Sequence, residues 1–151
     1  MVVPHADWNV IANGEETAVK RSQITSKEAQ RVVLDSNFSH WDCPEVGFLW
    51  DFERSPPIST YIYNVCAGDY RVVVNDDTEA QTPMRIFVSQ SKFDYLDSAE
   101  VFRVIREGID FYQDLFNRKF PFAKYDMIYV PEFRIGAMEN VGAITVTDRT
   151  L

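Results

Sequence analysis

The fold is decided by residues 125–147, which read YDMIYVPEFRIGAMENVGAITVT. Two apolar runs, at residues 127–130 and 143–146, predict a pair of strands that lie side by side. Between them, Gly136 and Gly142 bracket a short segment. Glycine is the usual residue where the backbone approaches a ligand or takes a positive φ, so this segment predicts a loop or edge strand that lines a cleft.

Glu139 is the residue of this segment whose chemistry suggests a function. A carboxylate accepts strong, charge-assisted hydrogen bonds from a cation such as an ammonium group. The alternative is a solvated glutamate in a surface loop, which is the commoner case for a glutamate in a short motif taken alone. The residues around Glu139 change the balance between these two interpretations.

The run from Tyr129 to Gly142 resembles the signature of the zinc aminopeptidases of the gluzincin family, in which a Gly-Ala-Met-Glu-Asn strand runs beside the substrate. The resemblance implies that Glu139 grips the free α-amino group of a peptide and that Asn140 buttresses the loop. It also implies that the backbone of the three preceding residues aligns the peptide. The substrate-binding residues on this interpretation are Gly136, Ala137, Met138, Glu139 and Asn140.

The resemblance further implies a metallo-aminopeptidase, an exopeptidase that uses zinc as cofactor to hydrolyse peptides with a free N-terminus. In that family a His-Glu-x-x-His zinc site follows downstream, and no such sequence occurs among these 151 residues. The resemblance therefore implies a piece of the enzyme, with the zinc ligands and the general base beyond Leu151. We expect this piece to be inactive alone and to have the remainder of its own catalytic domain as a partner.

Residues 1–92 predict a mainly β structure, because short apolar runs alternate with turn signals. Asn13-Gly14 predicts a hairpin between residues 8–12 and 17–21. Residues 59–67, 70–74 and 84–88 predict three successive strands that form a meander. Other candidate strands are residues 31–34 and 47–52. The resemblance identifies residues 1–92 as the distal part of a β-sandwich or saddle-like N-terminal domain.

Residues 93–151 predict an α+β structure that begins with a helix. Asp97 or Ser98 can cap the helix, and apolar residues then recur at helical spacing as far as Phe116. Gly108 inside this pattern suggests close packing against a neighbouring element. The resemblance identifies this part as the opening helix and strands of a thermolysin-like catalytic domain, with a boundary near residues 90–94.

Composition and charge exclude several classes of partner. The chain is 46% hydrophobic and 14% aromatic, which is enough for a packed core. Its formal charge of −8 argues against binding to nucleic acid or to an anionic membrane surface. No apolar run approaches the length of a membrane span, and the first five residues lack the pattern of a signal peptide. We therefore expect a cytoplasmic protein.

Two alternatives to the aminopeptidase stay open. The first is a non-enzymatic, β-rich interaction module that ends in a short α/β appendage. The second is an epoxide hydrolase of the leukotriene type, which shares the scaffold. That enzyme type typically carries glycine at the position of Ala137, so this residue favours the aminopeptidase.

Overall fold

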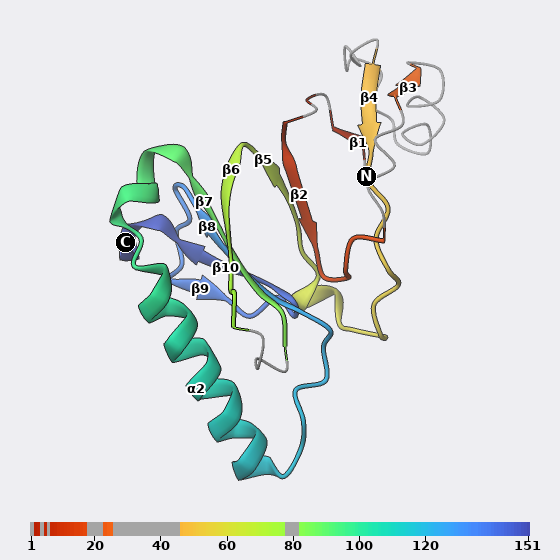
Figure 1. Cartoon of the computed structure of the whole chain (residues 1–151). Coiled ribbons are helices and arrows are strands. Elements are labelled where there is room, and N and C mark those ends of the chain that lie inside the picture. The colour runs from red at the N-terminus through yellow and green to blue at the C-terminus, as the bar shows by residue number, and fades with distance from the viewer. Residues whose placement is uncertain (1, 4, 6, 18–22, 26–45, 78–81) are drawn as a thin grey trace.

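The computed structural model describes residues 2–3, 5, 7–17, 23–25, 46–77 and 82–151, and in these ranges the chain is mostly β-strand with one long helix (Figure 1). The helix is α2, Ser98–Phe116. Short 3₁₀ turns lie at Thr60–Ile62, Gln90–Tyr95 and Asp148–Thr150. The strands are β1 (Val2–Val3), β2 (Asn9–Ala12), β3 (Gln23–Thr25), β4 (Val46–Leu49), β5 (Val65–Gly68), β6 (Tyr70–Val74), β7 (Met84–Ser89), β8 (Tyr125–Val130), β9 (Ala137–Met138) and β10 (Ala143–Thr147).

The central element is a five-stranded mixed sheet with the strand order β6-β7-β8-β10-β9. Strands β7, β8 and β10 run parallel, and the outer strands β6 and β9 run antiparallel to their neighbours. The predicted pairing of the two apolar runs is confirmed, because Met127 of β8 lies opposite Ile144 of β10. Since these strands are parallel, residues 131–142 must carry the chain back to the start of β10, and β9 lies within that return.

Side chains of the central strands alternate between two apolar layers. On one face, Ile86 of β7 packs in a cluster with Phe102 of α2. On the opposite face, Phe87 of β7 and Ile128 of β8 pack with Ile11 of β2. Strand β2 pairs only with β5 in the described structure, and the ribbon of these two strands covers the face of the sheet opposite α2 (Figure 1).

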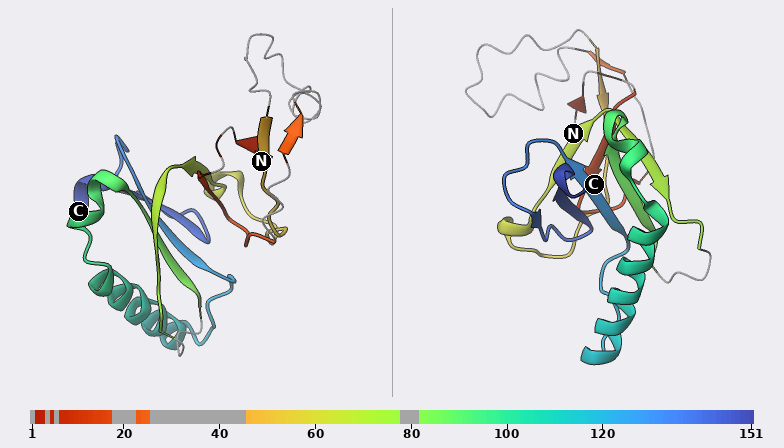
Figure 2. Two further views of the ribbon diagram at one scale, coloured as in Figure 1. Left: turned by 45° about the horizontal axis from the view of Figure 1, so that its top comes forward. Right: turned by 90° about the vertical axis from the view of Figure 1, so that its left-hand side faces the viewer.

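A third apolar cluster lies on the far side of the β2–β5 ribbon. Val10 of β2 and Ala67 of β5 pack there with Val3 and Trp50. The small sheet β1-β4-β3 adjoins this cluster, at the end of the molecule away from α2 and the C-terminus (Figure 2). The layers thus follow one another as helix, central sheet, two-stranded ribbon and small sheet, which agrees with the mainly β, then α+β expectation.

Two expectations about strand pairing do not hold among the described residues. Strand β2 pairs there with β5, with Ile11 opposite Cys66, and Thr17 is the one residue of the expected return strand that the structure describes. Thr17 instead donates its backbone N–H to Asp51, while residues 18–21 lie outside the described residues. The three-stranded meander is also wrong, because β5 belongs to the ribbon while β6 and β7 form a hairpin in the central sheet. The expected strand at residues 31–34 lies outside the described residues as well.

The strand expected at residues 59–67 is shorter than predicted. Its first half forms the 3₁₀ turn Thr60–Ile62, because the Ser59 side chain accepts a hydrogen bond from the backbone N–H of Tyr61. A serine side chain that bonds the backbone N–H two residues further on in this way competes with a strand ladder. Only Val65–Gly68 remains as strand β5.

Helix α2 begins and ends as its sequence predicts. The Asp97 carboxylate accepts the backbone N–H of Glu100, which is an N-cap bond, and Asn117 ends the helix in the left-handed conformation. Close packing at Gly108 is wrong for this structure, because a Cβ placed there would meet nothing within 4 Å. The described part of the chain contains no helix with the length and apolar content of a membrane span.

Candidate substrate-binding site at an edge strand

Strand β9 carries Ala137 and Met138 of the Gly-Ala-Met-Glu-Asn sequence and lies at one edge of the central sheet (Figure 1). Ala137 lies opposite Val146, and Met138 lies opposite Thr145. The backbone N–H of Thr147 donates to the carbonyl of Gly136 at 3.0 Å, which extends the ladder by one bond. On its other side β9 has no strand neighbour among the described residues, so its outer backbone groups are available to an extended ligand.

The five predicted site residues divide into an exposed group and a buried one. Gly136, Ala137 and Glu139 are exposed, and Met138 is half-buried. The Glu139 carboxylate makes no ion pair with any described residue. Asn140 is only 5% exposed. The site therefore presents backbone and a free carboxylate to solvent, while its asparagine points into the protein.

Asn140 connects three parts of the structure. Its side-chain amide donates to the carbonyl of Tyr63, which precedes strand β5, at 3.3 Å. Its side-chain oxygen accepts from the hydroxyl of Thr145 in β10 at 3.0 Å. Its backbone carbonyl accepts the N–H of Ala143 at 3.1 Å and closes a tight turn. These contacts give Asn140 the geometry of a residue that supports the loop.

Gly142 occupies the position in this turn that requires glycine. Its φ is +69°, a conformation that residues with a Cβ adopt at a cost. A Cβ at this position would also lie 2.6 Å from the backbone carbonyl oxygen of Asn13. Gly136 differs, since a Cβ there would meet nothing within 4 Å. Of the two bracketing glycines, one therefore shapes the turn and the other faces open space.

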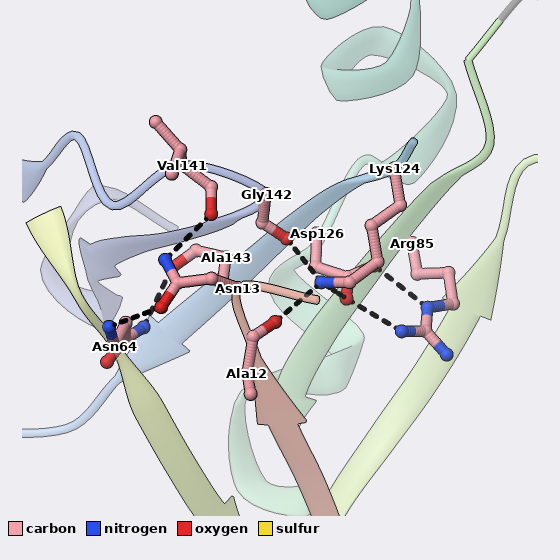
Figure 3. Close-up of polar contacts among 9 residues, drawn as sticks. All are labelled: Ala12, Asn13, Asn64, Arg85, Lys124, Asp126, Val141, Gly142 and Ala143. Carbon is pink, nitrogen blue, oxygen red and sulfur yellow. Dashed lines mark hydrogen bonds and ion pairs between the residues drawn. The ribbon is translucent and has the colours of Figure 1, made fainter. Parts of the chain in front are cut away.

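Asn13 makes contacts that bring the N-terminal segment onto this turn (Figure 3). Its amide group donates to the carbonyls of Val141 at 2.8 Å and Ile62 at 3.0 Å. Its side-chain oxygen accepts the backbone N–H of Asn64 at 2.8 Å. The side chain of Asn64 in turn donates to the carbonyl of Ala143 at 2.7 Å. Two asparagines thus bind the two sides of the Gly142 turn.

Lys124 is a buried cation on the other side of Gly142 (Figure 3). Its ammonium group donates to the carbonyl of Ala12 at 2.7 Å, to Asp126 Oδ2 at 2.7 Å and to the carbonyl of Gly142. An ammonium has three N–H donors, so these three contacts use all of them. Burial lowers the pKa of Lys124, and the neighbouring Asp126 carboxylate opposes that shift.

Asp126 is fully buried and forms the anionic centre of this cluster. Arg85 of β7 binds it with two hydrogen bonds, from Nε at 2.8 Å and from Nη2 at 2.7 Å. These bonds raise the pKa of Arg85. The backbone N–H of Asp126 also donates to Gly142 at 3.3 Å. A buried carboxylate held by two cations is satisfied, and it connects the turn to strands β7 and β8.

Sequence reasoning did not identify Asn13, Asn64, Lys124 or Asp126. Asn13-Gly14 looks like a hairpin turn, and a lysine two residues before an aspartate looks like a solvated pair. The available signal was weak: Lys124 directly precedes strand β8, and Asp126 is the one charged residue in that otherwise apolar strand. Lys124 and Asp126 are buried, and therefore need to be paired, because the end of β2 packs over them.

Metal ligands are not gathered anywhere in the described ranges. No group of three histidine, cysteine, aspartate or glutamate side chains there has the arrangement to hold a metal ion. The part of the chain that the structure describes therefore does not fit a zinc site.

Comparison with known proteins identifies several relatives. Residues 101–151 match the peptidase family M1 domain. Aminopeptidase N of Streptomyces lividans is 40% identical over 103 residues, which cover 67% of this chain and 12% of that protein. A probable aminopeptidase 2 of Sulfurisphaera tokodaii is 33% identical over 138 residues, covering 87% of this chain and 16% of that protein. Aminopeptidase 2 of Candida albicans is 32% identical over 120 residues, covering 80% of this chain and 12% of that protein. The chain thus spans a small part of the length of the relatives it matches.

Proposed function

Because this chain belongs to peptidase family M1, we propose that it is part of a zinc aminopeptidase and that residues 136–140 hold the N-terminal end of a peptide substrate. The observation that carries the proposal is the free, exposed carboxylate of Glu139 beside an edge strand with an open outer side. A peptide has a positively charged α-ammonium and an extended backbone. This site offers a complement to each of these features.

Glu139 supplies the specificity for a free N-terminus on this proposal. The α-ammonium of a peptide has a reference pKa near 8 and is largely charged at neutral pH. It donates charge-assisted hydrogen bonds to the carboxylate, which are roughly twice as strong as bonds between neutral groups. A substrate with an acylated N-terminus has no ammonium and loses these bonds.

The remaining site residues align the peptide. An extended chain can add to the open side of β9 by main-chain hydrogen bonds to Ala137 and Met138, as peptides do at other sheet edges. Gly136 leaves room for the substrate, since no atom lies within 4 Å of where its Cβ would be. Asn140 supports the loop from inside, and its buried side chain does not touch the substrate.

We propose that the zinc ion of this enzyme is bound by residues other than those that the structure describes, since these do not fit a metal site. The bound metal would supply polarisation of the scissile carbonyl and activation of water. The contribution of this chain is to hold the peptide at a fixed distance from that chemistry. The 151-residue chain is therefore expected to be inactive alone.

We also propose a domain assignment, with residues 1–92 in the N-terminal β-domain and residues 93–151 opening the thermolysin-like catalytic domain. The two parts are not separated in space, because strands β6 and β7 of the first part share a sheet with β8, β10 and β9 of the second. The boundary corresponds to the change from strands to helix α2. The cytoplasmic location expected from the sequence stays a prediction.

The remainder of the catalytic domain is proposed to cover the open face of α2. An apolar hollow of about 930 Å³ lies there, lined by residues such as Ile109, Tyr112 and Phe120. Phe111, which is 60% exposed, lies on the same helix. Exposed apolar surface of this extent usually marks an interface.

The decisive experiment replaces Glu139 with glutamine in the complete protein that contains this chain. The amide keeps the shape and removes the charge. A hydrogen bond to a charged group contributes about 1.5 to 3 kcal/mol, so kcat/KM for an aminoacyl substrate should fall roughly ten- to 150-fold. Zinc content, measured by elemental analysis, should not change.

Glu132→Gln is the matched control, because Glu132 is an exposed glutamate in the same return from β8 to β10. It removes the same charge seven residues earlier and should keep kcat/KM within about twofold. An N-acetylated substrate should be cleaved poorly by all three proteins. Equal kcat/KM for Glu139→Gln and wild type on the free-amine substrate would refute the anchor role.

A further inference from the structure

The position of Glu139 depends on backbone contacts made by its neighbours. Its own side chain bonds to no described residue, and β9 before it has only two residues. Strand β9 is held to β10 by the pairing of Ala137 and Met138 and by the hydrogen bond from Thr147 to the carbonyl of Gly136. So short a ladder is weak by itself, because strand pairing gains stability with each added residue. The turn that follows Glu139, residues 140–143, must supply the rest of the constraint.

Contacts to this turn come from a distant part of the chain. Asn13 binds the carbonyl of Val141, and Lys124 binds the carbonyl of Gly142. Lys124 also binds the carbonyl of Ala12, the residue before Asn13. The end of strand β2 and the turn are therefore bound to each other through two side chains (Figure 3). Residues 128 positions apart in sequence are joined by the Asn13–Val141 bond.

The turn has little freedom to move relative to β2. The carbonyl of Asn13 lies so close to Gly142 that a Cβ would be 2.6 Å away. Lys124 has all three donors engaged, and it sits on the carboxylate of Asp126, which is fixed by Arg85. Polar groups that are fully satisfied in a buried place rigidify their surroundings. A loop held in this way keeps its conformation before a ligand arrives.

We propose that Asn13 and Lys124 are positioning residues for Glu139, holding the 140–143 turn so that the carboxylate stands where a peptide α-ammonium arrives. The proposal rests on the proposed function of Glu139 and adds the residues that position its carboxylate. Neither residue touches the substrate. Their contribution is preorganisation, which matters because a misplacement of about 1 Å can cost on the order of 100-fold in rate.

Asn13→Asp in the complete protein tests the proposal. Aspartate keeps the oxygen that accepts from Asn64, but it turns the amide donor into a second oxygen, which repels the carbonyls of Ile62 and Val141. The turn should shift away from β2. We expect kcat/KM for a free-amine substrate to fall about tenfold, through a higher KM and a lower kcat together.

Asn9→Asp is the matched control at the other end of the same strand. The Asn9 amide donates to the carbonyl of Tyr70 at 2.8 Å, so the substitution makes the same kind of change in β2. It does not involve the 140–143 turn. We expect its kcat/KM to stay within about twofold of wild type. An equal loss in Asn9→Asp and Asn13→Asp would show general damage to β2 and overturn the proposal.

A double variant separates positioning from a merely structural role. If Asn13 acts through Glu139, then Asn13→Asp should cause no further loss of kcat/KM on the free-amine substrate in a Glu139→Gln background. Full additivity of the two losses would overturn the positioning role while leaving the function of Glu139 intact. No loss in Glu139→Gln alone would refute the proposed function itself, and the positioning proposal with it.

Amide hydrogen exchange gives a readout that does not depend on activity. The N–H of Ala143 bonds to Asn140 and closes the turn, so it should exchange at least about tenfold faster in Asn13→Asp and at the wild-type rate in Asn9→Asp. Unchanged exchange at Ala143 in Asn13→Asp would overturn the proposal. Should Asn13→Asp fail to fold, Asn64→Asp replaces the one bond to the carbonyl of Ala143 with a repulsion between two oxygens and is expected to give the same pattern at smaller amplitude.

Discussion

Gly142 and Gly108 differ in what a side chain would meet at each position. Gly142 has φ of +69°, and a Cβ there would lie 2.6 Å from the backbone oxygen of Asn13. Gly108 lies inside helix α2, and a Cβ there would meet nothing within 4 Å. Gly142 is therefore required by both conformation and space, while Gly108 only adds freedom to the unfolded chain.

Alanine at these two positions should change stability in opposite directions. Gly142→Ala combines a left-handed residue with a backbone clash and should lower the free energy of unfolding by at least about 2 kcal/mol. Gly108→Ala should raise it by about 0.5 to 1 kcal/mol, since alanine is the better helix former. Urea unfolding of both variants measures the difference. A tolerated Gly142→Ala would mean that the turn adjusts and that the contact with Asn13 is not rigid.

The side chain of Asp97 caps helix α2 at its N-terminus. Asp97 accepts the N–H of Glu100 at 3.1 Å, and acidic groups also interact favourably with the helix dipole at this end. Glu100 and Glu107 both bind Arg103, so the exposed face carries its own ion pairs. Such exposed pairs contribute little compared with the cap.

Asp97→Ala should therefore lower the free energy of unfolding by about 1 kcal/mol. Asp97→Asn keeps an oxygen that accepts the same N–H and should retain most of that stability, because asparagine caps helices about as well as aspartate. Thermal or urea unfolding of the two variants gives the comparison. Equal losses in both would assign the effect to the charge of Asp97 and not to the cap bond.

Strand β9 shows how a short element depends on what surrounds it. Two residues of strand are too few to be stable alone. The element persists because β10 provides one side and the 140–143 turn is bound to β2 and β8. Another chain can pair with its open edge. In many proteins such an edge promotes aggregation, whereas a peptide-binding protein can use it to bind an extended ligand.

The molecule as a whole buries several groups that ionise only in alkaline solution. Burial raises the pKa of the Cys66 thiol above its ordinary 9.0 and those of Tyr70 and Tyr125 above 10.0. Burial raises the pKa of Tyr129 in the same direction. Between the ordinary and the raised values the unfolded chain has lost these protons while the folded chain keeps them. The free energy of unfolding must then fall as pH rises.

Lys124 acts in the opposite direction. Its pKa is lowered from the ordinary 10.5, so over that window the unfolded chain binds more protons and stability rises with pH. Because four groups with raised pKa values oppose one lysine, we expect a net loss of stability as the pH rises above about 9. Urea midpoints across that range measure it. Tyr125→Phe should flatten the fall, because it removes one of the groups whose pKa is raised by burial.

Local patterns of the sequence by themselves determined α2, β8 and β10, while the substrate-binding role of residues 136–140 stays a proposal that began with a family resemblance. The helix follows from its apolar spacing and its capping aspartate, which are interactions within a few residues. The β8–β10 pairing follows from two apolar runs on either side of a short return. The Gly136–Asn140 segment was singled out because the run from Tyr129 to Gly142 resembles a family signature, since Glu139 alone has the sequence signal of a solvated loop residue.

Only the tertiary structure decided which strands lie together and what holds the site. Strand β2 pairs with β5 because its two faces fill the clusters around Ile11 and Val10, a choice that depends on distant partners and not on the turn that follows it. The same packing buries Lys124. It also brings Asn13, which the sequence predicts to be a hairpin-turn residue, into contact with the 140–143 turn. A charge or an amide has the same sequence signal whether it is solvated or buried, and only its neighbours in space determine which it is.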